Sequence, residues 1–386
     1  MNEKYDVAVV GAGPAGSASA LRVLQLRPDA RVLLLDAAEF PRDKTCGDGI
    51  AAHVLELLQA LGVPDLTDLG PAVPRLQLRS PGGRVVSRPC ARPNRVIPRA
   101  VFDAQLVSAA VARGAELRRH RVRRIDVHAG GVVLDESIEA AVVIGADGAN
   151  STVRRLLGAP DTAPKHTAVA IRGYAPTTVE PDALVIEFAR TRYPAYAWSF
   201  PLPGGGSNVG YGVFDRRGAG SRQELLDALR RLLPGHEPAP DTVRGHHLPL
   251  STGPRHHPDG RVLLAGDAAA MINPLTGEGI FDAVASGVLA GRAALLGADA
   301  GAAHRRAMEH SFSLHHRHGA LLAGLVAYPR FLDAAVTAAA RHKSVFDAAV
   351  DLGLGRGTAP VGALARVAAA YVTLGLPGRA GRPQPV

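Results

Sequence analysis

Three glycines near the start of the sequence carry the first chemistry that it suggests. Gly11, Gly13 and Gly16 form the pattern GAGPAG, and Asp36 follows about 20 residues after the last of them. In such a pattern the first glycine makes a tight turn, the second lets backbone approach a pyrophosphate, and the third lets a helix pack closely on a strand. N–H groups at the helix start attract phosphate, and the carboxylate accepts hydrogen bonds from a ribose. We therefore predict a dinucleotide site, although this pattern does not choose between FAD and NAD(P).

Two later segments also place a carboxylate beside glycine directly after an apolar run. They are residues 145–148, which contain Asp147, and residues 266–269, which contain Asp267. Ligands bind α/β sheets at the carboxyl ends of the strands, so both carboxylates are expected at that edge. Residues 273–279 then run straight into a helical pattern, and a helix start offers unpaired N–H groups and a positive dipole end to an anion.

The elements that must position these residues follow from the apolar pattern. Short apolar runs at residues 7–10, 32–35, 141–144 and 262–265 predict buried strands, and a helical pattern follows the first of them. Hairpins are expected over residues 75–88 and over 122–126 with 131–134, while residues 167–213 alternate like a separate sheet. From residue 278 onward the pattern is mostly helical. A helix after Pro98 places Arg99 and Asp103 on one face, where the simplest expectation is a solvated salt bridge.

The three motifs together, in this order, resemble those of the aromatic-hydroxylase-like flavoproteins, a superfamily of FAD-dependent oxidoreductases. Residues 46–50 (CGDGI), 196–201 (YAWSFP) and 266–280 (GDAAAMINPLTGEGI) narrow the resemblance to the geranylgeranyl reductase family. The similarity covers about residues 5–300 and implies FAD as the cofactor. In that family the aromatic strand lines the substrate pocket near the flavin, and the cysteine loop lies beside the isoalloxazine ring.

This resemblance assigns roles to individual residues. Cys46 and Trp198 are the catalytic candidates, and Tyr196, Trp198 and Phe200 are the expected substrate-binding residues. The simpler alternatives are a core aromatic for Trp198 and a small buried hydrophobe for Cys46. The expected FAD-binding residues are Gly11, Gly13, Ala15, Gly16, Asp36, Ala37, Cys46, Gly47, Arg99, Val122, Asp147, Asp267, Gly277, Gly279 and Ile280.

The expected fold is α/β, with a Rossmann-like FAD-binding domain, an inserted β-sheet substrate domain and a helical C-terminal region. We assign residues 1–70, 95–160 and 255–300 to the FAD-binding domain. Residues 71–94 and 161–254 form the β-rich substrate domain, and residues 301–386 form the helical region. The C-terminal region carries no motif that matches the family.

Two reactions are compatible with this reading, because the flavin does the chemistry in both. As a reductase, the protein transfers hydride from reduced flavin to a C=C bond of an isoprenoid or related apolar substrate. As a monooxygenase, it hydroxylates or epoxidises a natural-product-type substrate with O₂. A halogenase ranks third, because its expected WxWxIP is replaced by YAWSFP. A redox carrier without its own substrate is a fourth, non-enzymatic reading.

Composition and charge limit the classes of partner that the protein is expected to bind. The formal net charge is +9, but the positive residues are dispersed and lack interleaved aromatics, so we expect no nucleic acid. The densest cluster, residues 118–124, is expected to be a strand with solvated arginines. An anionic substrate tail or an acidic redox partner fits the charge better. No second GxGxxG opens a strand-helix unit, so electrons must come from transiently bound NAD(P)H or from a protein donor.

The setting is expected to be the cytoplasm. The sequence has two cysteines and no CxxC, which indicates a reducing compartment. No apolar stretch approaches the roughly 20 residues of a membrane span, although shallow contact with a membrane stays possible. Histidines crowd at His310, His315, His316 and His318, but neighbours on a helix point in different directions. We therefore expect no metal site.

Overall fold

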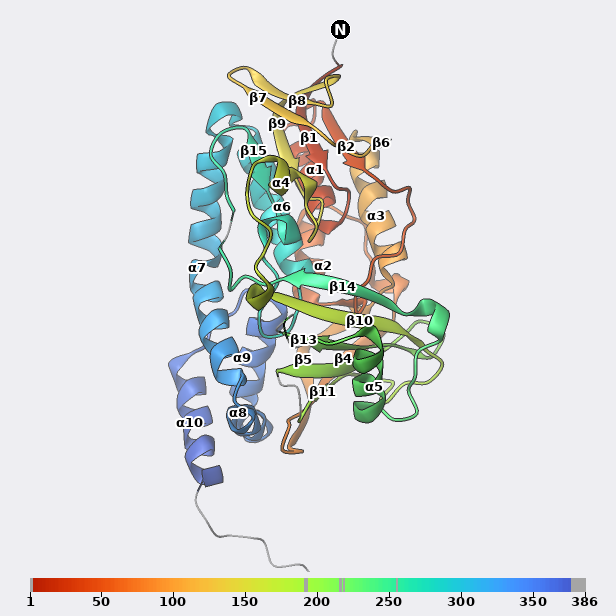
Figure 1. Cartoon of the computed structure of the whole chain (residues 1–386), viewed down its shortest axis with the longest axis vertical. Coiled ribbons are helices and arrows are strands. Elements are labelled where there is room, and N and C mark those ends of the chain that lie inside the picture. Colours follow the sequence, from red (N-terminus) through yellow and green to blue (C-terminus); the bar gives the residue numbers. More distant parts are fainter. Residues whose placement is uncertain (1–2, 191–193, 215–216, 218, 255, 376–386) are drawn as a thin grey trace, which may run out of the picture.

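The structure is a computed structural model that describes residues 3–190, 194–214, 217, 219–254 and 256–375. Two sheets lie one beyond the other along the long axis of the molecule, and the C-terminal helices run along one side of both (Figure 1). The architecture is the expected α/β fold, with a Rossmann-like sheet, a second sheet and a helical C-terminal region. The last eleven residues of the region expected to be helical lie outside the described part.

The first sheet has seven strands in the order β6-β2-β1-β9-β8-β7, with β15 also paired to β9. Strands β6, β2, β1, β9 and β15 are parallel to their neighbours, whereas β7 and β8 form an antiparallel extension. The residues at the centre of β1 are fully buried, as expected for a parallel strand covered on both faces. The bounds are β1 Glu3–Val10, β2 Val32–Asp36, β6 Glu116–Arg119, β7 Ile125–His128, β8 Gly131–Leu134, β9 Ile138–Gly145 and β15 Val262–Leu264.

Helices α1 (Pro14–Leu26), α3 (Arg99–Ala112), α6 (Ile280–Ala294) and α7 (Ala300–Val326) pack around this sheet. Glycines let α1 and α6 approach closely. A Cβ on Gly287 would lie 2.3 Å from the carbonyl oxygen of Ala15, and one on Gly291 would lie 2.5 Å from that of Ser19. The Ser19 hydroxyl also donates to the Gly287 carbonyl. These contacts hold the middle of α6 against α1, next to the glycine turn.

The second sheet has eight strands in the order β14-β10-β13-β12-β11-β4-β5-β3. Its pairs are antiparallel except β11 with β4, where two distant parts of the sequence meet. Helix α5 (Arg222–Leu232), which starts with a capping box of Ser221 and Glu224, packs on β13 and β10. The bounds are β3 Gly49–Ile50, β4 Ala72–Arg79, β5 Val85–Val96, β10 Thr167–Ala175, β11 Ala183–Phe188, β12 Ala195–Pro201, β13 Ser207–Val213 and β14 Arg244–Pro249.

Helices α8 (Pro329–Arg341) and α9 (Lys343–Leu354) pack against β5, and α10 (Val361–Gly375) packs on both of them. Buried Leu332 and Phe346 share one apolar cluster with Val73 and Val86 of the second sheet. Two shorter helices are α2 (Ala52–Ala60) and α4 (Thr152–Leu156).

Within the described ranges no single helix is long and apolar enough to cross a membrane. One pair, residues 297–326 and 329–341, passes that test only together and is bent by 115°.

Three local expectations were wrong. The arginine-rich segment forms a strand only as far as Arg119, and the hairpin strand expected from residue 122 begins at Ile125. The backbone between them follows the edge of the sheet, held there by Asp135. Arg99 and Asp103 do not form a solvated pair either, because they are 7% and 0% exposed and make a bidentate contact of 2.6 and 2.7 Å.

Candidate active site

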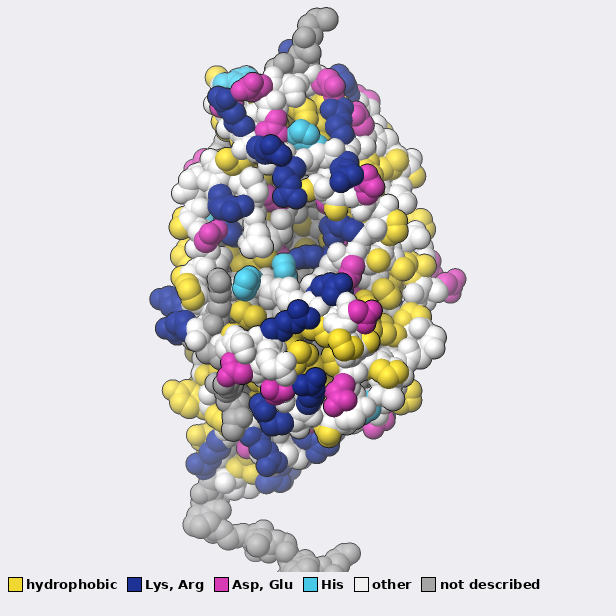
Figure 2. Space-filling model, turned by 45° about the vertical axis from the view of Figure 1, so that its right-hand side comes forward, with side chains coloured by type: hydrophobic (Ala, Val, Ile, Leu, Met, Phe, Trp, Pro, Cys, Tyr) yellow, Lys and Arg dark blue, Asp and Glu magenta, His cyan; other side chains and the backbone are white. Residues whose placement is uncertain are grey.

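One cavity of about 790 Å³ connects the glycine turn after β1, the second sheet and the C-terminal helices. This volume lies in the range of about 300–1,000 Å³ that is typical of small-molecule sites. Figure 2 shows a hollow in the middle of one face, with Lys and Arg side chains around it. Every site residue expected from the sequence lines the cavity except Gly16.

The glycine turn has the geometry that the pattern predicts. Gly11 has φ +101°, and a Cβ there would lie 2.3 Å from the carbonyl oxygen of Ala146. A Cβ on Gly16 would lie 1.8 Å from the Gly11 carbonyl oxygen, so this glycine serves the packing of α1. At Gly13 the nearest atom to such a Cβ is the Arg42 guanidinium, 3.6 Å away. The space above Gly13 is therefore open on the cavity side, as a pyrophosphate requires.

The carboxylate at the end of β2 is held in place by the glycine turn itself. One oxygen of Asp36 accepts from the Ala12 N–H and the other from the Ala38 N–H, both at 2.9 Å. Arg42 lies 3.5 Å from the same carboxylate. A carboxylate has about four lone-pair positions, so Asp36 can still accept hydrogen bonds from a ribose.

The two later carboxylates differ in their surroundings. Asp147 accepts hydrogen bonds from the Ser151 hydroxyl and from the first N–H groups of α4, so its own chain uses this carboxylate as a helix cap. Asp267 faces the cavity, where burial raises the pKa of its carboxyl and the positive charges of Lys44 and Arg99 oppose that shift. A cofactor hydroxyl has freer access to Asp267 than to Asp147.

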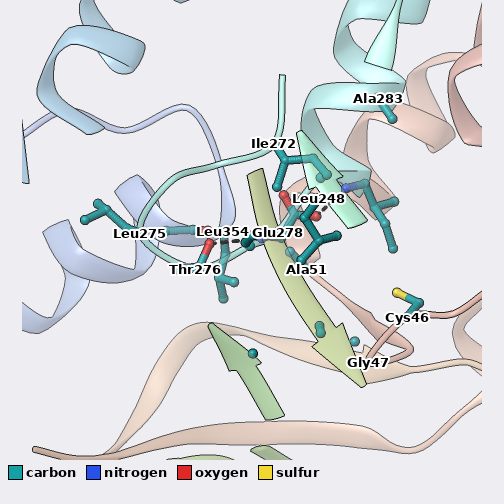
Figure 3. A pocket seen from close by; sticks show the side chains of 18 of the residues that line it. Cys46, Gly47, Ala51, Leu248, Ile272, Leu275, Thr276, Glu278, Ala283 and Leu354 are labelled. Carbon is teal, nitrogen blue, oxygen red and sulfur yellow. Dashed lines mark hydrogen bonds between the residues drawn. The ribbon is translucent and has the colours of Figure 1, made fainter. Parts of the chain in front are cut away.

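The loop before α6 places an acid at the helix start. An oxygen of Glu278 accepts from the N–H groups of Ile280 and Phe281, at 2.7 and 2.9 Å. The sequence pattern predicted that the N–H groups at this helix start would be free to bind an anion. This prediction was wrong for the N–H groups of Ile280 and Phe281, which Glu278 occupies. Burial raises the pKa of Glu278 to about 7. Figure 3 shows this loop, with Thr276 and Glu278, on the other side of the cavity from Cys46 and Gly47.

The raised pKa of Glu278 predicts how stability depends on pH in the FAD-free protein. Between roughly pH 4.5 and 7 the folded state keeps a proton that the unfolded state has lost, so Glu278 lowers the stability as the pH rises through this window. Glu278→Gln keeps the acceptor oxygen and removes the charge. We expect it to stabilise the apoprotein by on the order of 2 kcal/mol at about pH 8, and little at about pH 4.5. Thermal unfolding followed by circular dichroism measures this, and an equal gain at both pH values would contradict it.

The cysteine loop is held by a buried hydrogen-bond network. Asp48, at φ +61° and fully buried, accepts hydrogen bonds from the Tyr174 hydroxyl, the Asn208 amide and the Arg99 N–H. The Asn208 amide also donates to the Cys46 carbonyl oxygen at 2.8 Å. Burial raises the pKa of the Cys46 thiol, so the sulfur keeps its proton at neutral pH.

Aromatic side chains of β12 pack directly on this loop. A Cβ on Gly47 would lie 3.1 Å from the Phe200 ring and 3.3 Å from Nε1 of Trp198, and one on Gly49 would lie 3.3 Å from Phe200. Trp198 is 6% exposed and donates through Nε1 to the Asn208 side chain at 3.0 Å. Trp198 is thus both a packed core aromatic and a wall of the cavity, so the core role and the substrate-binding role expected for it are compatible. Tyr196 donates its hydroxyl to the Thr276 carbonyl, which joins β12 to the loop before α6.

A basic pair also lines the cavity. Lys44 Nζ lies 2.5 Å from Nε2 of His246 on β14. Burial and the neighbouring Lys44 lower the pKa of His246 to about 3, so the imidazole is neutral and can accept from the ammonium. Sequence reasoning missed Lys44, His246, Asn208 and Tyr174, because each lies outside the cores of the recognised motifs. It also gave no role to Glu278, which lies inside one of them.

Comparison with known proteins decides the family. Residues 4–293 match the model of a family described as an FAD binding domain. The chain belongs to this FAD-binding family. It is therefore an FAD-dependent oxidoreductase, and the residues around the glycine turn fit the cofactor, since open space over Gly13 and the carboxylates of Asp36 and Asp267 all face one cavity.

Two similar curated proteins are named as reductases. A menaquinone reductase of Mycolicibacterium smegmatis is 32% identical and covers 91% of this chain and 91% of its own length. A digeranylgeranylglycerophospholipid reductase of Methanopyrus kandleri is 34% identical over 76% of this chain and 80% of its own length.

Solved structures share the fold. A geranylgeranyl bacteriochlorophyll reductase-like protein of Thermoplasma acidophilum has a TM-score of 0.78 at 20% identity, covering 95% of this chain and 96% of its own. A flavin-dependent brominase has a TM-score of 0.72 at 18% identity, covering 97% and 100%. At such identities these structures show the architecture and not the reaction.

Proposed function

We propose that this flavoprotein reduces C=C bonds of an isoprenoid or similar apolar substrate. The observation that carries the proposal is one continuous cavity, which begins at the glycine turn and ends among apolar side chains of the C-terminal helices. Leu332, Val336, Phe346, Val350 and Val367 line this distant part. A long hydrocarbon chain could lie there while its reacting end meets the cofactor. The names of the reductase relatives support this substrate class.

The site residues have distinct tasks in this proposal. When bound, reduced FAD supplies a hydride. The backbone at Gly11 and Gly13 holds the pyrophosphate, Asp36 holds the ribose, and Asp267 with the loop at Gly277 and Gly279 orients the flavin end. Trp198 and Phe200 wall the substrate, with Tyr196 bracing that wall. The Cys46 thiol, protonated at neutral pH and facing the cavity, donates the proton that completes reduction.

This role of Cys46 predicts a separation between two half-reactions. In Cys46→Ala we expect the flavin to be reduced at the normal rate while turnover of substrate falls by about 100-fold, in the range typical of lost general-acid catalysis. Stopped-flow absorbance at the flavin bands measures both steps. Cys90→Ala is the matched control, because the only other cysteine lies on β5 and does not line the cavity. Unchanged turnover in Cys46→Ala would show that this thiol only packs.

The alternative reaction is oxygen transfer by an FAD-dependent monooxygenase. The shared fold with a flavin-dependent brominase supports it, since that class of enzyme also works through a flavin in this architecture. Oxygen dependence separates the two proposals, because only the monooxygenase consumes O₂.

We further propose that the electron donor is transiently bound NAD(P)H or a partner protein.

The domain division that we propose is the one expected from the sequence, with residues 1–70, 95–160 and 255–300 holding FAD. Residues 71–94 and 161–254 shape the substrate site, and the described part of 301–386 closes its far end. The two sheets support this division, although β3 (Gly49–Ile50) pairs with β5 in the second sheet.

We place the protein in the cytoplasm, in shallow contact with a membrane that delivers the apolar substrate. Exposed apolar side chains on the C-terminal helices support this contact. Leu321 on α7 and Tyr328 directly before α8 are 62% and 67% exposed, and Val361 and Val372 on α10 are 83% and 62% exposed. These helices also line the apolar end of the cavity.

A further inference from the structure

Three buried side chains that could hold a metal ion meet where α7 crosses the start of α6. They are Asp282 on α6 and the neighbours His315 and His316 on α7. Each contributes one potential ligand atom, and these atoms all lie within 4.8 Å of one another. The side chains are 2%, 3% and 1% exposed, and none of the three lines the FAD-site cavity. The cluster is therefore separate from the candidate active site.

Asp282 is the residue that most needs a partner. Both of its carboxylate oxygens are buried, and neither has a hydrogen-bond partner within the described part of the chain. A buried carboxylate without a partner is costly, and natural proteins pair such groups or bind a metal with them. The nearby acids Glu278 and Asp267 make the local potential more negative, whereas Arg356 is the positive group that opposes them. A cation is the ligand that this site lacks.

The histidines are oriented as metal ligands usually are. The Nδ1 of His315 lies 2.8 Å from the Gly357 carbonyl oxygen, so it donates there and leaves Nε2 for the cluster. Metal-binding histidines commonly donate their second ring N–H to a backbone carbonyl in this way. The ring of His316 stacks on Phe312, with centroids 5.3 Å apart and planes at 17°, which fixes its plane. The sequence argument that adjacent histidines point apart was wrong for this pair, because both reach Asp282.

We propose that Asp282, His315 and His316 bind one divalent transition-metal cation of the Zn²⁺ type, which links α6 to α7. Two imidazoles and one carboxylate without a thiolate suit such a cation. With metal–ligand distances of about 2.0–2.2 Å, the three ligand atoms must close to roughly 3.4 Å from one another. Three protein ligands leave a position for water. The bound cation neutralises Asp282 and holds the first turn of α6, whose start faces the cavity at Gly279 and Ile280.

The test uses the full-length holoprotein, treated with a chelator and then titrated with Zn²⁺ or Co²⁺. We expect one metal per chain by elemental analysis, and Co²⁺ absorption bands at wavelengths longer than those of the flavin. Asp282→Asn, which keeps the side-chain shape, and His316→Gln should each weaken binding by more than about 100-fold. His310→Ala is the control, because His310 lies exposed on the same helix and should leave binding unchanged.

The results distinguish a built site from adventitious binding. Circular dichroism and FAD content establish that each variant is folded, and the two ligand variants serve as independent checks. A wild-type protein that takes up no Zn²⁺ at micromolar concentration overturns the proposal. So does binding that survives in Asp282→Asn, or binding that is lost in His310→Ala.

Discussion

Gly13→Val should give a folded, colourless protein. Gly13 has φ −71°, which any residue adopts, and its added Cβ would meet nothing closer than the Arg42 guanidinium at 3.6 Å. The valine side chain would nevertheless fill the space through which the pyrophosphate must pass. We expect FAD affinity to fall by at least about 100-fold, or roughly 2.8 kcal/mol. Flavin absorbance of the purified protein and titration of the apoprotein with FAD measure this loss.

Gly16→Ala is the informative comparison. Its Cβ would lie 1.8 Å from the Gly11 carbonyl oxygen, so the substitution should disturb the fold itself and lower the unfolding temperature. Gly13→Val should leave the circular dichroism spectrum unchanged. Full FAD content in Gly13→Val would show that the pyrophosphate does not pass over this glycine.

Turnover without oxygen should distinguish the two proposed reactions completely. A reductase needs only reduced flavin and substrate, because a hydride and a proton complete the reaction. We expect enzyme reduced by dithionite under strict anaerobiosis to convert a menaquinone or a digeranylgeranylglycerophospholipid to a product heavier by two hydrogen atoms. The flavin should reoxidise when substrate is added. Absorbance of the flavin and mass spectrometry of the product follow the two events in one experiment.

A requirement for oxygen would assign the alternative reaction. If nothing happens until oxygen is admitted, and the product then carries an oxygen atom from labelled O₂, the protein is a monooxygenase. Enzyme reduced in the absence of substrate and then exposed to oxygen is the control for uncoupled oxidation of the flavin.

Local patterns were sufficient to predict the fold. The apolar runs that became β1, β2, β9 and β15 lie directly before glycine or acidic motifs, so the parallel sheet and its functional edge could be predicted together. The boundaries near Arg119 and Ile125 were less predictable, because contacts with Asp135 across the sheet edge determine where the strands end. The Arg99–Asp103 pair was placed on the correct helix face, but its burial depends on packing that periodicity cannot show.

Backbone geometry could be predicted where one short segment carries all the needed information. Gly11 and Gly16 are examples, since their steric roles follow from spacing alone. The network around Asp48 was missed, because Tyr174 and Asn208 reach it from strands more than a hundred residues away. Glu278 was missed for a different reason. It stands inside a recognised turn, but its use of the helix N–H groups depends on the side-chain conformation.

The contact between the Cys46 loop and the β12 aromatics has a consequence for engineering substrate scope. A Cβ added to Gly47 or Gly49 would lie only 3.1 or 3.3 Å from the Phe200 ring. The large side chain at position 200 therefore requires glycine at positions 47 and 49, so the loop and the strand depend on each other. Residues in such contact give strongly non-additive effects when they are changed together. A library that varies Phe200 alone would therefore mostly leave unfilled space beside Gly47 and Gly49. Variation of the loop and the strand as one unit is the route by which this pocket can acquire a new shape.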